Sequence, residues 1–204
     1  MAILGIAFGT TACRMAVYGG NGPRLLRDAR GSEAIDAYFG FDSKTNWPVV
    51  GERVKSLFQS NPSMAVEQIR RRMGEDVQIS FGNEEVESQR LTPEEIAAHI
   101  FRYLKRSAEE RLEEPVDRCV ITVPPNFTEP ARRATKKAGE IAGMTVERLI
   151  NEPTAAALAH KHVKPLGSGH VMVYDLGQAT FDVSIVKSMG DVFDIRSSSG
   201  DSHF

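Results

Sequence analysis

Cysteine, net charge and long apolar runs are all scarce in this chain of 204 residues. Only two cysteines occur, Cys13 and Cys119, each inside a strand-like run, so we expect reduced, buried thiols rather than a disulfide framework. The net charge of −2 gives no basic surplus for nucleic acid. No apolar run approaches the length of a membrane span, and the first residues lack the basic flank of a signal peptide. We therefore expect a cytoplasmic protein whose partners include neither nucleic acid nor a membrane.

Strand-like and helical patterns alternate along the second half of the chain. Cys119–Val123 and Val146–Ile150 are short apolar runs typical of buried strands, and helical patterns follow each of them. Such alternation predicts an α/β fold with a parallel or mixed sheet. The clearest helix is Leu91–Glu114, where Thr92 is the expected N-cap of a capping box. The other predicted helices are Glu52–Gln59, Ser63–Met73, Thr128 or Glu129 to Ala142, and Thr154–His160.

Two predicted hairpins have related sequences. The first joins Ala2–Phe8 to Cys13–Tyr18, and the second joins Val171–Tyr174 to Phe181–Val186. The segment at 5–11 parallels the segment at 174–180, which predicts a duplicated unit with two loops facing one ligand. A carboxylate at the end of the first strand of the later hairpin could face a phosphate-bound cation. An ordinary β-hairpin with an aspartate in its turn is the alternative interpretation.

Several motifs together carry a family resemblance. They are GIAFGTT at 5–11, INEPTAAALA at 150–159, VYDLG at 173–177 and FDVSIV at 181–186. With them the chain resembles, essentially end to end, the first half of the nucleotide-binding domain of the heat shock protein 70 family. These are the DnaK-type chaperones of the actin-like ATPase superfamily. The resemblance implies an α/β actin-like ATPase (ribonuclease H-like) fold, lobe I only, with a mixed sheet and flanking helices. It also implies a core of residues 1–38 and 112–204 and a smaller inserted subdomain at about 39–111.

The resemblance also implies where the phosphates of ATP or ADP would bind. Small residues let a backbone approach an anion closely, and the family places such residues in two loops. The positions that match the first loop are Gly9, Thr10 and Thr11, and those that match the second are Gly177 and Thr180.

Charged residues of the family's site also have counterparts here. The positions of the catalytic carboxylates around Mg²⁺ are taken by Glu152, Asp175 and Asp182, and Asp175 would contact the metal through bound water. By its spacing to Gly74, Arg70 falls where the family has a phosphate-contacting lysine. The alternatives are a helix N-terminal acid stabilised by the dipole for Glu152 and a solvated helix residue for Arg70.

Three differences from the family pattern predict impaired hydrolysis. Ala7 stands where the family has an aspartate that orients metal-bound water. Gln178 and Ala179 replace glycines of the second loop and put side chains where the backbone should meet phosphate. Arg70 keeps the charge of the lysine but not its shape.

The resemblance implies an ATP-binding module of a molecular chaperone involved in the stress response. The family is an ATPase, and this chain is expected to be a fragment without the second lobe and the peptide-binding domain, inactive alone. Its partners would be nucleotide, the rest of the same chaperone chain, cochaperones and unfolded clients. The alternatives are a degenerate, non-hydrolysing relative that acts as a regulatory or protein-binding module, and an actin-like filament protein.

Overall fold

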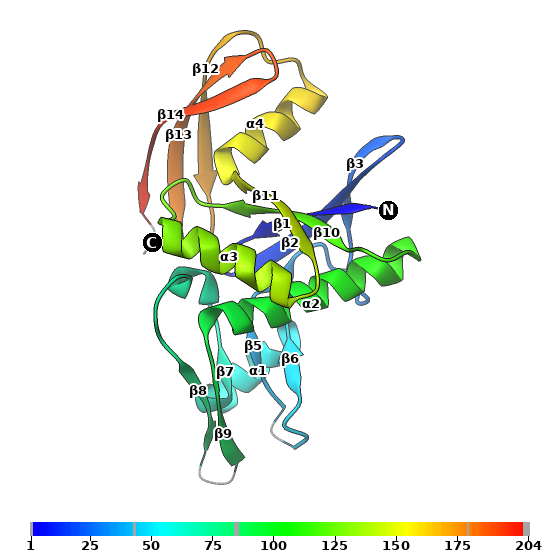
Figure 1. Cartoon of the computed structure of the whole chain (residues 1–204), viewed down its shortest axis with the longest axis vertical. Helices are drawn as coiled ribbons and strands as arrows, with labels where there is room; N and C mark the ends of the chain where they lie inside the picture. Colours follow the sequence, from blue (N-terminus) through cyan, green and yellow to red (C-terminus); the bar gives the residue numbers. More distant parts are fainter. Residues whose placement is uncertain (1, 43, 84–85, 179, 202–204) are drawn as a thin grey trace. The chain divides into compact units, whose positions relative to one another are not determined.

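The computed structural model describes residues 2–42, 44–83, 86–178 and 180–201 (Figure 1). Contacts divide the chain into two compact units. Unit 1 comprises Met1–Ile121 and Thr128–Leu149, and unit 2 comprises Thr122–Phe127 and Ile150–Phe204. The inserted subdomain predicted at about 39–111 lies wholly within unit 1, and its independence stays a prediction. Each unit is described on its own below.

A six-stranded mixed sheet makes up the centre of unit 1. Its strand order is β11-β10-β1-β2-β3, and β4 also pairs with β2. The pairs β1–β2, β2–β3 and β2–β4 are antiparallel. The strands are β1 (Ile3–Phe8), β2 (Ala12–Gly19), β3 (Gly22–Leu26), β4 (Ile35–Asp36), β10 (Arg118–Val123) and β11 (Thr145–Asn151).

One face of this sheet is buried because apolar residues alternate along its strands. In β1 the side chains of Leu4, Ile6 and Phe8 are at most 1% exposed, while Ala7 between them is exposed. Phe8 packs edge-on against Phe101, with ring centroids 4.9 Å apart. The buried face therefore packs on the long helix that carries Phe101.

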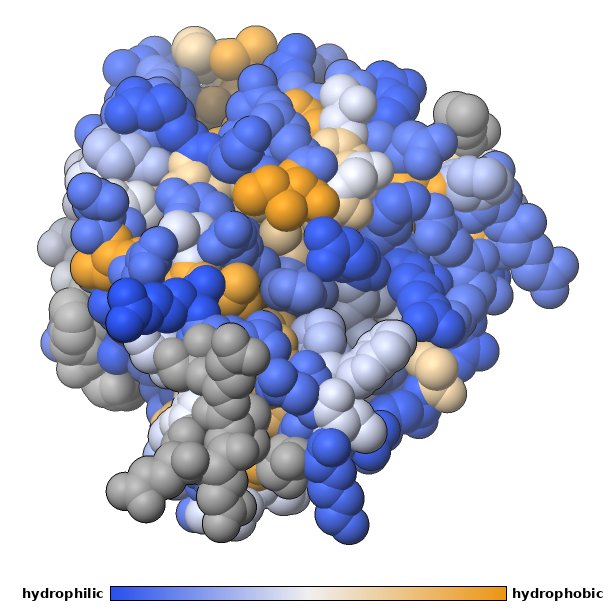
Figure 2. Space-filling view, turned by 60° about the horizontal axis from the view of Figure 1, so that its bottom comes forward, coloured by the Kyte–Doolittle hydropathy of each residue, from blue (hydrophilic) through white to orange (hydrophobic). Residues whose placement is uncertain are grey.

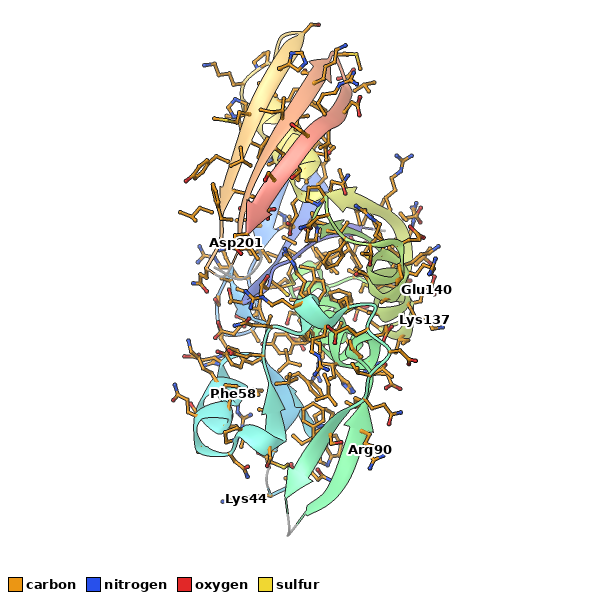
Figure 3. All side chains as sticks on the ribbon, turned by 90° about the vertical axis from the view of Figure 1, so that its left-hand side faces the viewer. Lys44, Phe58, Arg90, Lys137, Glu140 and Asp201 are labelled. Atoms are coloured by element: carbon orange, nitrogen blue, oxygen red, sulfur yellow. The ribbon has the colours of Figure 1, made fainter. Side chains whose placement is uncertain are left out.

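That helix is α2 (Pro93–Leu112), and the sequence predicts its start correctly. Thr92 and Glu95 form the expected capping box: Glu95 Oε2 accepts from Thr92 N at 2.8 Å, and Thr92 Oγ1 accepts from Glu95 N at 3.4 Å. Helix α3 (Glu129–Ile141) packs along α2 and begins after Thr128, which caps it. Lys137 and Glu140 are exposed on α3, and Figure 3 shows both side chains directed outward.

Two small sheets complete unit 1. One has the order β6-β5-β7 and the other is the hairpin β8–β9. The rings of Phe39, Phe41 and Phe81 meet edge to face, with centroids 5.3–5.4 Å apart. The elements are β5 (Phe39–Phe41), β6 (Pro48–Val50), α1 (Glu52–Ser60), β7 (Ala65–Val66), β8 (Ile79–Asn83) and β9 (Val86–Leu91).

The helix predicted at Ser63–Met73 is wrong. The segment consists of two 3₁₀ turns, η1 (Pro62–Met64) and η2 (Ile69–Arg72), with strand β7 between them. Pairing with β5 holds β7 extended, and Gln68 has a φ of 55°, which ends any right-handed helix there. Tertiary pairing has overridden a locally helical pattern.

Unit 2 is a three-stranded antiparallel sheet and one helix. The strands β12 (Gly169–Leu176), β13 (Phe181–Met189) and β14 (Val192–Asp201) lie in chain order, and helix α4 (Glu152–Val163) packs on them. Lys161 of α4 donates to Gly190 O at 2.8 Å and also pairs with Asp191. The predicted hairpin of Val171–Tyr174 and Phe181–Val186 is confirmed. Asp201 closes β14 (Figure 3).

Apolar side chains remain exposed on one face of the unit 2 sheet. Met172, Tyr174 and Leu176 alternate along β12 and are 64%, 62% and 59% exposed. The face shown in Figure 2 is mostly hydrophilic, with apolar residues in small separate groups. Among the described residues, no helix is long and apolar enough to cross a membrane.

Candidate functional site

The turn of the first hairpin, between β1 and β2, is tight because its residues are small. The register Phe8↔Cys13 leaves Gly9, Thr10 and Thr11 to reverse the chain before β2. A Cβ on Gly9 would lie 2.1 Å from Ala12 O, so only glycine fits there. The residues that the sequence predicts for the first phosphate loop thus lie together in one tight turn.

Arg70 reaches this turn from η2. Its side chain is buried, at 6% exposed, and Nη1 donates to Phe8 O at 2.8 Å. The hydrogen bond crosses 62 positions of sequence and places a guanidinium beside the loop residues. A solvated helix residue, the alternative interpretation of Arg70, is contradicted by this burial.

Thr10 and Cys13 are both buried at this turn. Burial raises the pKa of the Cys13 thiol to about 12, while the Gly9 backbone N–H and then the charges of Arg70 and Arg14 act in the opposite direction. Thr10 is 6% exposed, and its Oγ1 has no hydrogen-bond partner within the described residues. A buried hydroxyl in that state is a group that a bound oxyanion can satisfy.

The second hairpin, between β12 and β13, belongs to unit 2. Gly177 N donates to Thr180 O at 2.8 Å and closes its turn, and Gln178 is exposed. A Cβ on Gly177 would lie 3.1 Å from Thr180 Oγ1, so this glycine is less constrained than Gly9. Ala179, which the sequence predicts to crowd the loop, lies outside the described residues.

Two carboxylates face each other at the end of this hairpin. Asp175 and Asp182 are direct partners in the β12–β13 register and therefore share one face of the sheet. Gly200 of β14 lies opposite Asp182, and a Cβ there would come within 2.5 Å of Asp182 Oδ1. The missing side chain at Gly200 makes room for the carboxylate.

Glu152 is the first residue of α4 and is half-buried. It lies in the same unit as the two facing aspartates, at a helix N-terminus where a carboxylate is stabilised by the dipole. Gly9, Thr10, Thr11 and Arg70 belong to unit 1, whereas Glu152, Asp175, Gly177, Thr180 and Asp182 belong to unit 2. The structure brings the first group together around one turn and places the aspartate pair at the other.

The two hairpins differ in the ligands that they offer to magnesium. Mg²⁺ prefers carboxylate and water oxygens, and the pair of Asp175 and Asp182 offers carboxylates on one face. In the first hairpin Ala7 offers no ligand, and its cross-strand partner is Arg14, a cation. Within the described part of the chain, no three acidic, histidine or cysteine residues are grouped closely enough to hold a metal ion.

A family model described as "Hsp70 protein" matches residues 3–204. The chain belongs to the Hsp70 family. The predicted family and fold class are thereby confirmed: this is an α/β chain with the lobe I architecture of the actin-like ATPase fold. Hsp70 proteins carry a chaperone-type ATP-binding module and generally depend on ATP or ADP and on Mg²⁺.

Sequence reasoning missed Arg14 as a residue of interest in this Hsp70 chain. No motif includes it, and only the strand register shows that it lies across from Ala7. The signal was nonetheless available, because a short turn after Phe8 fixes which residues of the two strands face each other.

Proposed function

We propose that the chain is the ATP-binding module of a heat-shock-70-like chaperone and that its hydrolysis is impaired. The observation that supports this best is the buried Arg70 guanidinium, bonded to Phe8 O beside a turn with the orphan Thr10 hydroxyl. A buried cation, an unsatisfied hydroxyl and a backbone open to close approach form an anion site built before the ligand arrives. The β- and γ-phosphates of a nucleotide are the anions that the family binds.

In this proposal the roles of the second hairpin follow the family. Asp175 and Asp182 hold the hydrated metal, with Glu152 as a further catalytic carboxylate, and Gly177 and Thr180 contact phosphate. The chain would act with a second lobe and a peptide-binding domain, and through them with cochaperones and unfolded clients. A cytoplasmic location and a stress-response role belong to the same proposal, and the buried, unpaired thiols of Cys13 and Cys119 support a reducing compartment.

Impaired hydrolysis rests on Ala7. Its methyl group is exposed on β1 and cannot orient metal-bound water, as the family's aspartate does. Loss of one positioned catalytic contact commonly costs on the order of a hundredfold in rate. We expect no measurable ATP hydrolysis by this chain. Magnesium-dependent hydrolysis that survives removal of contaminating chaperones would contradict this part of the proposal.

A degenerate relative that binds but does not turn over nucleotide is the second candidate. The cation at Arg14 favours it, because a guanidinium lies directly across the strand from Ala7, the position where the family has a carboxylate. Replacing Ala7 by Asp together with Gln178→Gly and Ala179→Gly separates the two candidates. The rate of ATP hydrolysis is compared between wild type and this triple variant in the longest available gene product. A higher rate in the variant supports an impaired ATPase, and an unchanged rate supports the binding protein.

Calorimetric titration with ATP and with ADP tests nucleotide binding directly. We expect a Kd near about 1 mM, because phosphate contacts alone supply roughly 4 kcal/mol. Thr10→Val should weaken binding, and Thr10→Ser should retain it, because serine keeps the hydroxyl. The proposal would be overturned if titrating either nucleotide into the protein gave no more heat than titrating it into buffer, at protein concentrations above the expected Kd.

A further inference from the structure

The segment that carries Arg70 begins with a strained residue. Gln68 stands directly before η2 with a φ of 55° and a ψ of 31°, in the left-handed region that residues other than glycine rarely adopt. Arg71 N donates to Gln68 O at 3.0 Å, so the 3₁₀ turn starts from this residue. Such a conformation persists only where neighbouring contacts hold it. The contacts that hold the chain at Gln68 therefore also fix where the Arg70 side chain leaves the backbone.

A tyrosine beside β5 holds the residue that precedes Gln68. Strand β7 pairs with β5 through Phe39↔Val66, and the next position along the same ladder sets Tyr38 opposite Glu67. The Tyr38 hydroxyl donates to the Glu67 carboxylate, and this hydrogen bond, followed by burial, raises the pKa of Tyr38 to about 12. A hydrogen bond to a carboxylate is stronger than one between neutral groups. It anchors Glu67 where β7 has ended and the strained turn begins.

Tyr38 is itself fixed by other parts of unit 1. Its backbone carbonyl accepts from Gly51 N at 3.0 Å. Its ring meets the ring of Phe58 on α1 edge to face, with centroids 5.8 Å apart (Figure 3). Tyr38 and Glu67 are both half-buried, so water competes less for their hydrogen bond than at an exposed site. The hydroxyl is therefore a fixed point to which the chain before η2 is tied.

The other end of this short segment meets the phosphate turn. The Arg70 side chain is 6% exposed, and its Nη1 donates to Phe8 O at 2.8 Å. Only Gln68 and Ile69 lie between Glu67 and Arg70. Ile69 is 1% exposed, and a packed side chain leaves little room to absorb a movement of the backbone beside it. A shift at Glu67 is therefore carried to the guanidinium.

We propose that Tyr38, through Glu67, is a positioning residue that sets the Arg70 guanidinium against the phosphate turn. The proposal rests on the proposed nucleotide-binding function, to which it adds a residue that no sequence motif includes. The hydrogen bond decides where the guanidinium lies, whatever other groups contact it. When the bond is lost, the strain at Gln68 can relax and the guanidinium can leave Phe8 O.

Two measurements on Tyr38→Phe test the proposal. NMR of the arginine guanidinium protons, assigned with Arg70→Lys, reports the bond from Arg70 to Phe8 O, because a bonded proton exchanges slowly with water. We expect this protection in wild type and its loss in Tyr38→Phe. Calorimetric titration with ADP in MgCl₂ reports binding. Tyr38→Phe should raise the Kd about three- to tenfold, the size of one hydrogen bond.

Tyr103→Phe is the matched control. Tyr103 is also half-buried in unit 1 and also donates to a carboxylate, Asp28 Oδ2, at 3.1 Å. Its loss should lower the free energy of unfolding about as much as Tyr38→Phe does, because each variant removes one hydrogen bond of the same kind. It should leave the Arg70 signal and the Kd for ADP unchanged. A merely structural role of Tyr38 would make the two variants alike.

A pair of variants at Glu67 tests the path from Tyr38 to Arg70. Glu67→Gln keeps an oxygen that accepts from the Tyr38 hydroxyl, whereas Glu67→Ala removes the acceptor. Glu67→Gln should therefore retain more of the Arg70 protection and more of the affinity for ADP. Equal losses in the two variants would show that Tyr38 does not act through Glu67, and would overturn the proposal.

The outcomes separate the inference from the proposed function. No protected Arg70 signal in wild type, an unchanged signal in Tyr38→Phe, or equal changes in Tyr38→Phe and Tyr103→Phe would overturn the positioning role. A lost signal with an unchanged Kd for ADP would support the positioning role and contradict a contact between Arg70 and phosphate. Absence of ADP binding by wild type would overturn the proposed function, and the guanidinium signal alone would then decide the inference.

Discussion

The two hairpins have similar residues where their first strands end, but they differ in burial and in charge. In each, an apolar residue and a glycine end the first strand: Phe8 and Gly9 in unit 1, Leu176 and Gly177 in unit 2. Phe8 is 1% exposed, whereas Leu176 is 59% exposed. The same short sequence pattern therefore produces a core element in one unit and a surface element in the other.

Their charges are opposite as well. The first hairpin presents guanidiniums, from Arg14 and from the buried Arg70, while the second presents the facing carboxylates of Asp175 and Asp182. The proposed ligands differ accordingly, with an anion at the first hairpin and a hydrated cation at the second. A repeated motif predicts repeated geometry, but the chemistry of each copy depends on which residues face each other across the strands.

The largest expected effect concerns burial. Phe8→Ala should destabilise unit 1 by about 3–5 kcal/mol, because it removes a fully buried ring and its contact with Phe101. Leu176→Ala should change stability by less than about 1 kcal/mol. Urea unfolding followed by circular dichroism measures both, and Phe8→Leu should lose less than Phe8→Ala. Equal losses of unfolding free energy in Phe8→Ala and Leu176→Ala would contradict the distinction between a buried first hairpin and an exposed second hairpin.

Glycine at the turn should matter more in the first hairpin. Gly9→Ala places a Cβ against a backbone carbonyl 2.1 Å away, and we expect a loss of about 1–3 kcal/mol. A Cβ at Gly177 would meet Thr180 Oγ1 at 3.1 Å and the backbone Thr180 O at 3.2 Å, both looser contacts than the one at Gly9, so the loss in Gly177→Ala should be smaller. The same unfolding assay checks the order. A larger loss at Gly177 would mean that the second turn is the tighter one.

Alkaline pH should weaken unit 1 selectively. The folded-state pKa of Cys13 is about 12, above its ordinary value of 9.0, so between these pH values only the unfolded chain releases the thiol proton. Stability is therefore lost as pH rises from about 9 toward 12, by up to about 1.4 kcal/mol per pH unit. Comparing the pH slope of wild type with that of Cys13→Ala isolates this contribution. Parallel slopes would contradict it.

The smallest expected effect is at the carboxylate pair. Asp175→Asn should raise stability by a few tenths of a kcal/mol, because it removes one of two like charges directly opposite each other. Asp194→Asn is the control, since Asp194 pairs with Arg196 at 3.3 Å and its loss should be slightly destabilising. A loss above about 2 kcal/mol at Asp175 in urea melts would instead identify it as a structural hydrogen-bond acceptor.

Local signals predicted the elements that local interactions hold. The capping box at Thr92 and Glu95 and both hairpins were readable, because the residues that make them are neighbours in sequence. The segment at 63–73 was not, because β7 is extended by pairing with β5 and not by its own residues. The apolar residues that suggested a helix include Met64 and Ile69. Both are buried, but they lie in 3₁₀ turns.

The candidate site also has a part that the sequence could predict and a part that depends on tertiary structure. The resemblance predicted that Arg70 takes the place of a phosphate-contacting lysine, and this role stays a prediction. The structure places its guanidinium at Phe8 O, beside the first loop. The resemblance could not point to Arg14, because motif matching compares positions along the chain. That Arg14 lies opposite Ala7 follows only from the pairing of the two strands. The distance between the loops of the repeated hairpins is likewise a tertiary property that no repeat encodes.

The hydrogen bond from Arg70 to Phe8 has a consequence for the order of folding. A hairpin of neighbouring residues forms in about 1–10 μs, but this bond must close a loop of 62 residues. During synthesis at about 5–20 residues per second, Arg70 is added roughly 3–12 s after Phe8. The backbone of the turn is thus synthesised seconds before the arginine that bonds to it. The anion site proposed for this hairpin can be completed only when the first third of the chain has been made.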